Sequence, residues 1–204
     1  MDHRATDQVI TTPRLILREW KDSDNEPFAL LNADPRVMEF MSKALTREES
    51  DVFIEKIKAH FVKHGFGLFA ASLRENQKLV GFVGLYVPTF KTDFTPCTEI
   101  GWRLAAEYWN NGLATEGARA VLRHAFTTLN LPEVVSYTVP ANIGSRRVMQ
   151  KIGLVHQQSE DFDHPNLPAG HPLRRHVLYR LRRSDWIAMQ TQVGLISKRD
   201  TSAG

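Results

Sequence analysis

Several features that mark other classes of protein are missing from this 204-residue sequence. It has one cysteine, Cys97, so it can form neither an internal disulfide nor a cysteine-based zinc site, and this suits a reducing compartment. No apolar run approaches the roughly 20 residues that span a bilayer, and the polar N-terminus lacks the apolar core of a signal peptide. We therefore expect a cytoplasmic protein with no membrane partner.

Charge of one sign is also scarce, because 26 Lys and Arg face 23 Asp and Glu, a formal net charge of +3. This small excess does not indicate a nucleic-acid-binding protein. The signatures G-x-x-x-x-G-K-[ST], G-x-G-x-x-G and G-x-S-x-G are absent as well. Their absence argues against a nucleotide triphosphatase, a Rossmann enzyme and a serine hydrolase.

Metal-binding patterns are equally weak. His60 and His64 have the i, i+4 spacing of two helical metal ligands. The intervening Glu of H-E-x-x-H and an obvious third ligand are missing, so we expect a solvated helix face and no metal cofactor.

The composition is that of an ordinary globular domain, with 42% hydrophobic and 24% charged residues. The length fits one domain, which we expect over residues 10–190, with flexible tails at 1–9 and 193–204. Thr46-Arg47-Glu48-Glu49 is a capping box that predicts the start of a helix. Hydrophobic periodicity predicts, in chain order, a strand at 14–20, helices at 24–33 and 46–63, strands at 68–73, 79–87 and 98–104, a helix at 112–129, a strand at 134–139, a helix at 143–152, and strands at 154–158 and 175–181.

The most informative segment is the strand that ends at Leu104, because a short turn leads from it directly into a long amphipathic helix. The free N–H groups and the dipole of a helix N-terminus favour an anion there, and Gly112 lets a bulky anion approach the backbone. Asn110-Asn111-Gly112 is therefore a candidate site for a phosphate or diphosphate. The same residues are typical of an ordinary turn, so both interpretations stay open.

A second segment begins the helix predicted at 143–152, with Asn142 and Ser145 at its start and Gly153 at its end. Asn is among the best N-caps, so capping is the favoured interpretation of these two residues taken alone. Capping and ligand contact are compatible, since a side chain at a helix start can also face an adjacent cleft.

Together, W-N-N-G-L-A-T-E and V-P-A-N-I-G-S-R-R-V-M-Q-K-I-G-L resemble the acetyl-CoA core of the GNAT superfamily of N-acetyltransferases. T-P-R-L-I-L-R, E-I-G-W-R-L and H-V-L-Y-R-L extend the resemblance over nearly the whole chain, and it is closest to the branch of ribosomal-protein N-terminal acetyltransferases. It implies a single α+β domain with a mixed, mostly antiparallel twisted sheet of about seven strands, splayed in the middle and flanked by about four helices. Trp109 and Leu154 depart from the residues common in the superfamily, but the implied backbone cradle does not depend on them.

The resemblance also implies a function, the transfer of an acetyl group from acetyl-CoA to a primary amine by direct attack on the thioester. The amine is either a protein N-terminus or a small molecule. A non-catalytic acyl-CoA sensor or an RNA-associated module of the same fold is the alternative. The protein would be a monomer or a homodimer, with Trp186 as a candidate for packing on a partner.

The implied site lies between the two segments. Strand 100–104 would splay from strand 134–139 and hold the pantetheine, the turn 110–115 would bind the diphosphate, and Asn142 would contact the cofactor arm. Ser145, near the sulfur, and Glu99 are the candidate catalytic acid and base, although a solvated strand-end carboxylate is an open alternative for Glu99. The expected cofactor-binding residues are Ile100, Trp102, Arg103, Leu104, Trp109, Asn110, Asn111, Gly112, Leu113, Ala114, Thr115, Asn142, Ser145 and Arg147.

The resemblance frames the acceptor site by residues 34–45 and 161–176, which include Met38, Phe40, Phe162, His164 and His171. These histidines are either bases or hydrogen-bonded loop residues, and the second interpretation is favoured. A basic cluster near the C-terminus would contact the cofactor 3′-phosphate, an acidic substrate or RNA, or would simply be solvated strand residues, which we favour. The cluster comprises Arg174, Arg175, His176, Arg180, Arg182 and Arg183.

Overall fold

The computed structural model describes residues 9–200, and their side chains as far as residue 192. The expected tails therefore lie largely outside the described residues, except that residues 193–200 continue the last helix. The elements are β1 (Ile10–Thr11), β2 (Leu15–Arg18), η1 (Asp22–Asp24), α1 (Asn25–Ala33), α2 (Pro35–Met38), α3 (Arg47–His64), β3 (Leu68–Leu73), β4 (Leu79–Tyr86), β5 (Glu99–Leu104), η2 (Ala106–Tyr108), α4 (Leu113–Thr127), β6 (Glu133–Thr138), α5 (Ile143–Lys151), β7 (Val155–His156), η3 (Gln158–Glu160), β8 (Phe162–Asp163), β9 (Arg175–Arg182) and α6 (Arg183–Asp200).

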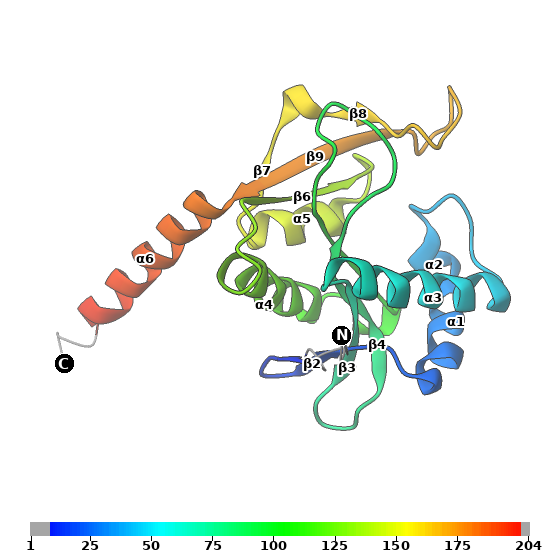
Figure 1. Ribbon diagram of the computed structural model, residues 1–204, viewed down its shortest axis with the longest axis horizontal. Coiled ribbons are helices and arrows are strands. Elements are labelled where there is room, and N and C mark those ends of the chain that lie inside the picture. Colours follow the sequence, from blue (N-terminus) through cyan, green and yellow to red (C-terminus); the bar gives the residue numbers. More distant parts are fainter. Residues whose placement is uncertain (1–8, 201–204) are drawn as a thin grey trace.

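One mixed sheet runs through the molecule in the order β1-β2-β3-β4-β5-β6-β9-β7, with β8 paired to β9 (Figure 1). Every pair of neighbours is antiparallel except β5 and β6, which are parallel. The predicted α+β class is confirmed. The sheet has nine strands where about seven were expected, because the two-residue strands β1 and β8 are additional. The strand expected at 154–158 is present as the shorter β7. The described chain also has six α-helices where about four were expected, the short α2 and the terminal α6 being additional.

Helices cover both faces of the sheet, and this explains why β3 and β4 are buried along almost their whole length. On one face, Phe28 of α1 and Ile54 and Ile57 of α3 form a core with Phe82 of β4. On the other face, α4 packs its apolar side, which includes Val121 and Phe126, against the central strands. The central strands are therefore packed on both faces.

Local signals set the ends of α3. The Thr46 side chain accepts a hydrogen bond from the Glu49 N–H (3.2 Å), and the Glu49 carboxylate accepts one from the Thr46 N–H (3.0 Å). The predicted capping box is thus confirmed. Gly65, with a φ of 72°, ends the helix.

His60, near the end of α3, is buried. The prediction that it lies on a solvated helix face is therefore wrong. Its Nδ1 lies 2.8 Å from the carbonyl oxygen of Phe66, and its Nε2 accepts a hydrogen bond from the Val87 N–H (2.9 Å). This arrangement requires a neutral ring with the proton on Nδ1, and burial lowers the pKa of His60 accordingly. Among the described residues, no group of three or more His, Cys, Asp or Glu side chains could hold a metal ion.

The last helix, α6, leaves the body of the molecule after β9 (Figure 1). Its first turns pack back on the core, with the ring of Trp186 5.5 Å from that of Phe126. Trp186, which the sequence suggested for packing on a partner, is thus half-buried against the core of its own chain. No helix in the described part of the chain is both long and apolar enough to cross a membrane.

Candidate functional site

The centre of the sheet opens between β5 and β6. The two strands share one register pair, Glu99 with Val135, and then diverge toward their C-terminal ends. The Val135 N–H donates to the Thr98 carbonyl (2.9 Å) at this vertex. Backbone groups alternate in direction along a strand, so Trp102 and Leu104 direct theirs into the gap, where no strand pairs with them. The gap is a slot whose edge can pair with an extended ligand.

The N-terminus of α4 follows the open end of β5. Asn110 (φ 60°) and Gly112 (φ 78°) form a left-handed turn that leads into the helix. The backbone N–H groups of Leu113, Ala114 and Thr115 have no acceptor among the described residues, as is usual in a first helical turn. A methyl group added at Gly112 would meet only the Arg14 guanidinium at 3.5 Å, so the backbone there is open to an anion.

Arg14 and Glu116 support this turn, a pairing that the sequence analysis missed. The Glu116 carboxylate, in the first turn of α4, accepts hydrogen bonds from the Thr12 hydroxyl (2.7 Å), the Arg14 N–H (2.8 Å) and the Arg14 Nε (2.7 Å). Arg14 Nη1 also donates to the carbonyl of Asn111 (2.8 Å). Burial alone would raise the pKa of Glu116, but these hydrogen bonds lower it overall. The segment before β2 therefore holds the turn before α4 in place through these hydrogen bonds.

We expect Glu116→Ala to lower the free energy of unfolding by about 1–3 kcal/mol, because three hydrogen bonds to a largely buried carboxylate are lost. Urea denaturation measures this change. Glu107→Ala is the matched control, since the Glu107–Lys78 ion pair is exposed and its loss should cost less than about 1 kcal/mol. Equal losses in the two variants would contradict the supporting role of Glu116.

The N-terminus of α5 follows the open end of β6. The Asn142 side-chain oxygen accepts a hydrogen bond from the Ser145 N–H (3.0 Å), so Asn142 is the N-cap that the sequence indicated. Asn142 and Ser145 also line the cleft described below. The two residues therefore cap the helix and lie at the cleft at the same time. Arg147 is exposed on α5 and does not line the cleft.

A cleft of about 560 Å³ lies beside the slot, between β5, β6, the segment after α2 and the loop before β9. Glu99 lies in it, at the vertex of the diverging strands, and accepts a hydrogen bond from the Tyr137 hydroxyl (2.6 Å). Burial raises the pKa of Glu99 to about 7, while the Tyr137 hydrogen bond acts in the opposite direction. Glu99 is thus a cleft residue, not the solvated strand-end carboxylate that the sequence left open.

Aromatic side chains form much of the lining of the cleft. Phe40 and His164 line it, as predicted, whereas Met38 is buried in the core and His171 does not line it. His176, assigned to the basic cluster from the sequence, lines it too, and burial lowers the pKa of both His164 and His176. Tyr137, His164 and His176 of the cleft lining pack against the rings of Phe90, Phe94 and Phe162. Phe162, which was also predicted for the cleft, therefore lies behind its lining residues and does not line it.

Some of the expected cofactor-binding residues have side chains that pack within the protein, whereas the side chain of Arg103 reaches the cleft. Ile100 and Leu104 bury their side chains in the core, and Trp109 donates through its indole N–H to the Leu104 carbonyl (2.8 Å), so these residues offer backbone groups or packing. Arg103 pairs its backbone with Phe82 of β4 instead and extends its side chain into the cleft.

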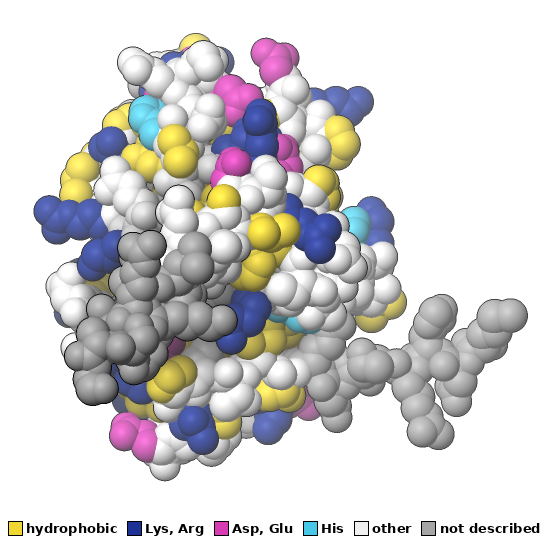
Figure 2. Space-filling model, turned by 90° about the vertical axis from the view of Figure 1, so that its left-hand side faces the viewer, with side chains coloured by type: hydrophobic (Ala, Val, Ile, Leu, Met, Phe, Trp, Pro, Cys, Tyr) yellow, Lys and Arg dark blue, Asp and Glu magenta, His cyan; other side chains and the backbone are white. Residues whose placement is uncertain are grey.

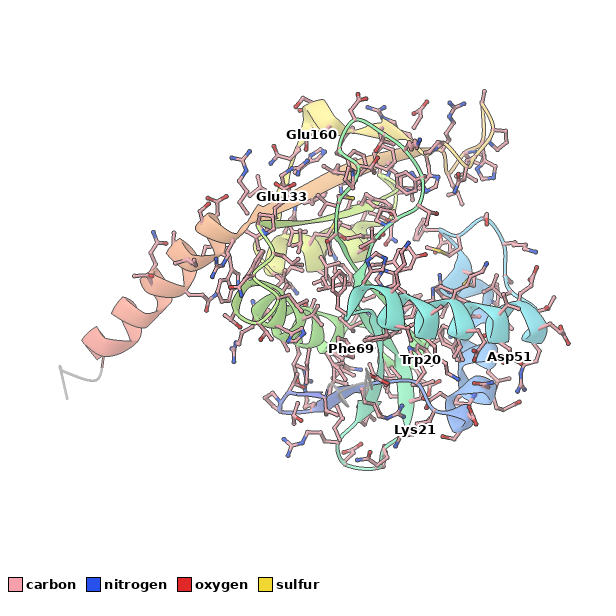
Figure 3. The ribbon with its side chains drawn as sticks, in the orientation of Figure 1. Trp20, Lys21, Asp51, Phe69, Glu133 and Glu160 are labelled. Carbon is pink, nitrogen blue, oxygen red and sulfur yellow. The ribbon has the colours of Figure 1, made fainter. Side chains whose placement is uncertain are left out.

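The basic cluster is dispersed and largely neutralised. Arg180 forms ion pairs with Glu133 and Glu160, which both lie close to β9 (Figure 3). Arg174 and Arg175 both approach Asp163. On the face in Figure 2, Lys and Arg side chains are scattered among other residues rather than gathered into one basic surface. The favoured interpretation of solvated strand residues does not hold for Arg180, whose side chain is only 12% exposed.

Comparisons with known proteins agree on one family. A family model described as "Acetyltransferase (GNAT) domain" matches residues 14–155. The FsC-acetyl coenzyme A-N(2)-transacetylase of Aspergillus fumigatus is 32% identical over 195 residues, which cover 89% of this chain and 79% of that protein. A GNAT-family acetyltransferase from Bacillus anthracis superposes with a TM-score of 0.71 at 26% identity, over 87% of this chain and 99% of the other. The ribosomal-protein-S5-alanine acetyltransferase of Vibrio fischeri shares the fold, with a TM-score of 0.69 at 19% identity over 88% and 99% of the two chains.

Proposed function

Because this chain belongs to the acetyltransferase (GNAT) family, we propose that it transfers the acetyl group of acetyl-CoA to a primary amine, either a small molecule or a protein N-terminus. The observation that carries the proposal is the slot between β5 and β6, which opens from Glu99 toward the free N–H groups of α4. A thioester at the vertex and a diphosphate at the helix N-terminus fit the two ends of this slot. The single cysteine, Cys97, suits a cytoplasmic location.

In this proposal the chain binds acetyl-CoA mainly through its backbone. Trp102 and Leu104 pair with the pantetheine amides along the open edge of β5, and the N–H groups of Leu113, Ala114 and Thr115 hold the diphosphate. Asn142 contacts the cofactor arm from the start of α5. Arg147, exposed on α5, is placed to meet the outer part of the cofactor.

Acetyl-CoA supplies the activated acyl group, and the chain supplies proton transfers. Glu99, with a pKa of about 7, accepts a proton from the incoming amine, directly or through water. The N–H of Trp102, which faces the slot, stabilises the negative charge that develops on the carbonyl oxygen. Ser145, which lines the cleft, donates a proton to the departing sulfur.

We expect Ser145→Ala to lower kcat by about 10²-fold with little change in acetyl-CoA affinity, because the hydroxyl serves the leaving group and not ground-state binding. Steady-state kinetics and isothermal titration calorimetry measure the two quantities. An unchanged kcat, with chemistry shown to limit turnover, would remove Ser145 from the mechanism.

The proposal is tested by calorimetry with acetyl-CoA and CoA, followed by an assay of thiol release with a library of primary amines. We expect both ligands to bind and at least one amine to release the thiol. Binding without release for any amine would indicate an acyl-CoA sensor instead. Tight RNA binding that weakens steeply with salt would indicate the RNA-associated alternative.

A further inference from the structure

Arg103 is a cation held inside the cleft, on the same face of β5 as Glu99. It lies four residues beyond Glu99 in an extended strand, so the two Cα atoms are separated by about 13 Å. The guanidinium carbon lies 5.6 Å from the Phe53 ring centroid and 5.4 Å from that of Phe82. Burial lowers the pKa of Arg103 to about 10, which still leaves the side chain fully charged at neutral pH.

The guanidinium is oriented by neutral groups. Nη1 donates to the Asn32 side-chain oxygen (2.7 Å), and Nη2 lies 3.3 Å from the sulfur of Met41. Asn32 is itself fully buried and donates to the Ser50 hydroxyl (2.9 Å), which fixes its amide with the oxygen toward Arg103. Arg103 is therefore held in place without a carboxylate.

No Asp or Glu among the described residues forms an ion pair with Arg103, whereas the half-buried Arg18 pairs with Asp24 and Arg180 pairs with Glu133. A guanidinium carries five N–H donors in a planar fork, and the contacts of Arg103 use only part of them. Burial of a cation is costly unless an anion compensates it. Arg103 is one of the residues that line the cleft, so an anion in the cleft can reach it.

The remaining titratable groups of the cleft do not compensate this charge. Glu99 lies at the vertex and is hydrogen-bonded to Tyr137. Tyr86, His164 and His176 are neutral near pH 7, because burial raises the pKa of the tyrosine and lowers those of the two histidines. The cleft thus has a base at one end and a fixed positive charge at the other.

We propose that the amine acceptor carries a carboxylate, which Arg103 binds while the amine lies toward Glu99. This inference rests on the proposed acetyl transfer and names the class of its acceptor. Two carboxylate oxygens match the planar fork of a guanidinium, and the pairing supplies the anion that the fold does not. A diamine would instead bring a second positive charge against Arg103.

The test is calorimetric titration of the CoA-bound protein with three ligands of one chain length: δ-aminovalerate, its amide and cadaverine. We expect δ-aminovalerate to bind at least tenfold more tightly than the amide, and cadaverine to bind no better than the amide. In Arg103→Met, δ-aminovalerate should lose this advantage. Arg103→Lys, which keeps the charge but not the fork, should retain part of it.

Lys56→Gln is the matched control, because Lys56 is an exposed cation on α3 outside the cleft and its removal should leave the preference intact. Unchanged CoA affinity and thermal unfolding show that the Arg103 variants are folded. Binding of δ-aminovalerate that is absent, or no tighter than that of the amide, overturns the proposal. Failure of the transferase assignment would look different, since no amine of the library would then release thiol from acetyl-CoA.

Discussion

Glu99→Gln should lower kcat by about 10²–10⁴-fold, because the amide still accepts the Tyr137 hydrogen bond but cannot take a proton from the amine. The effect should have a pH signature. Since the pKa of Glu99 is raised to about 7, the wild-type rate should rise as the pH increases through 7 and the carboxylate becomes ionised. This inflection should be missing from the variant.

Profiles of log kcat/KM against pH, recorded for both proteins, measure this difference. A second rise from the acceptor amine itself, near pH 8 for an α-amine and near 10.4 for a lysine-type amine, should remain in the variant. Glu133→Gln is the control, since Glu133 begins the neighbouring strand but pairs with Arg180 outside the cleft. If the Glu99→Gln variant keeps the inflection near pH 7, another group is the base.

The second large effect is expected on acetyl-CoA affinity, from a substitution in the turn before α4. In Gly112→Val, a branched side chain is forced into a left-handed conformation at φ 78°, which costs about 1–3 kcal/mol or displaces the turn. The added methyl groups also occupy the open approach to the N–H groups of Leu113 and Ala114. We expect the Kd for acetyl-CoA to rise at least tenfold, as measured by calorimetry.

Gly65→Val is the control that distinguishes the effect of backbone strain from the effect of a blocked acetyl-CoA site. Gly65 has a similar φ of 72° at the end of α3, and a Cβ added there would meet no atom within 4 Å. Thermal unfolding should therefore show comparable destabilisation in the two variants, while only Gly112→Val weakens acetyl-CoA binding. A loss of affinity shared by both would mean that the diphosphate does not depend on this turn.

Elements with a strong local signal were predictable. Strand β3 has the predicted bounds, and α3 begins where its capping box requires, because an apolar run between turn residues and a capping box are both encoded within a few residues. The strands β1 and β8 were not predicted, because two residues cannot show a period, and the strand predicted at 154–158 forms only over Val155–His156, as β7. These short strands form only because β2 and β9 present edges for them to pair with.

The site was predictable where the residues are close in sequence. The turn at Gly112 and the capping pair Asn142 and Ser145 could be found from their order in the chain. The contact of Glu116 with Arg14 joins residues 102 positions apart, so no local pattern indicates it. The cleft position of Arg103 did have a signal, since alternation in E-I-G-W-R-L puts it on the face of Glu99, opposite the apolar Ile100.

The hydrogen bonds from Thr12 and Arg14 also decide how far the chain can be shortened on the N-terminal side of β2 without disturbing the turn before α4. Thr12 and Arg14 bond to the first turn of α4, and Arg14 holds the carbonyl of Asn111 as well. A version of the chain trimmed to start at Leu15 would keep β2 and most of the hydrophobic core, but it would lose β1 with Ile10. It would also leave the turn that we propose binds the diphosphate without these supporting hydrogen bonds. Truncation and tag placement should therefore spare the residues upstream of β2.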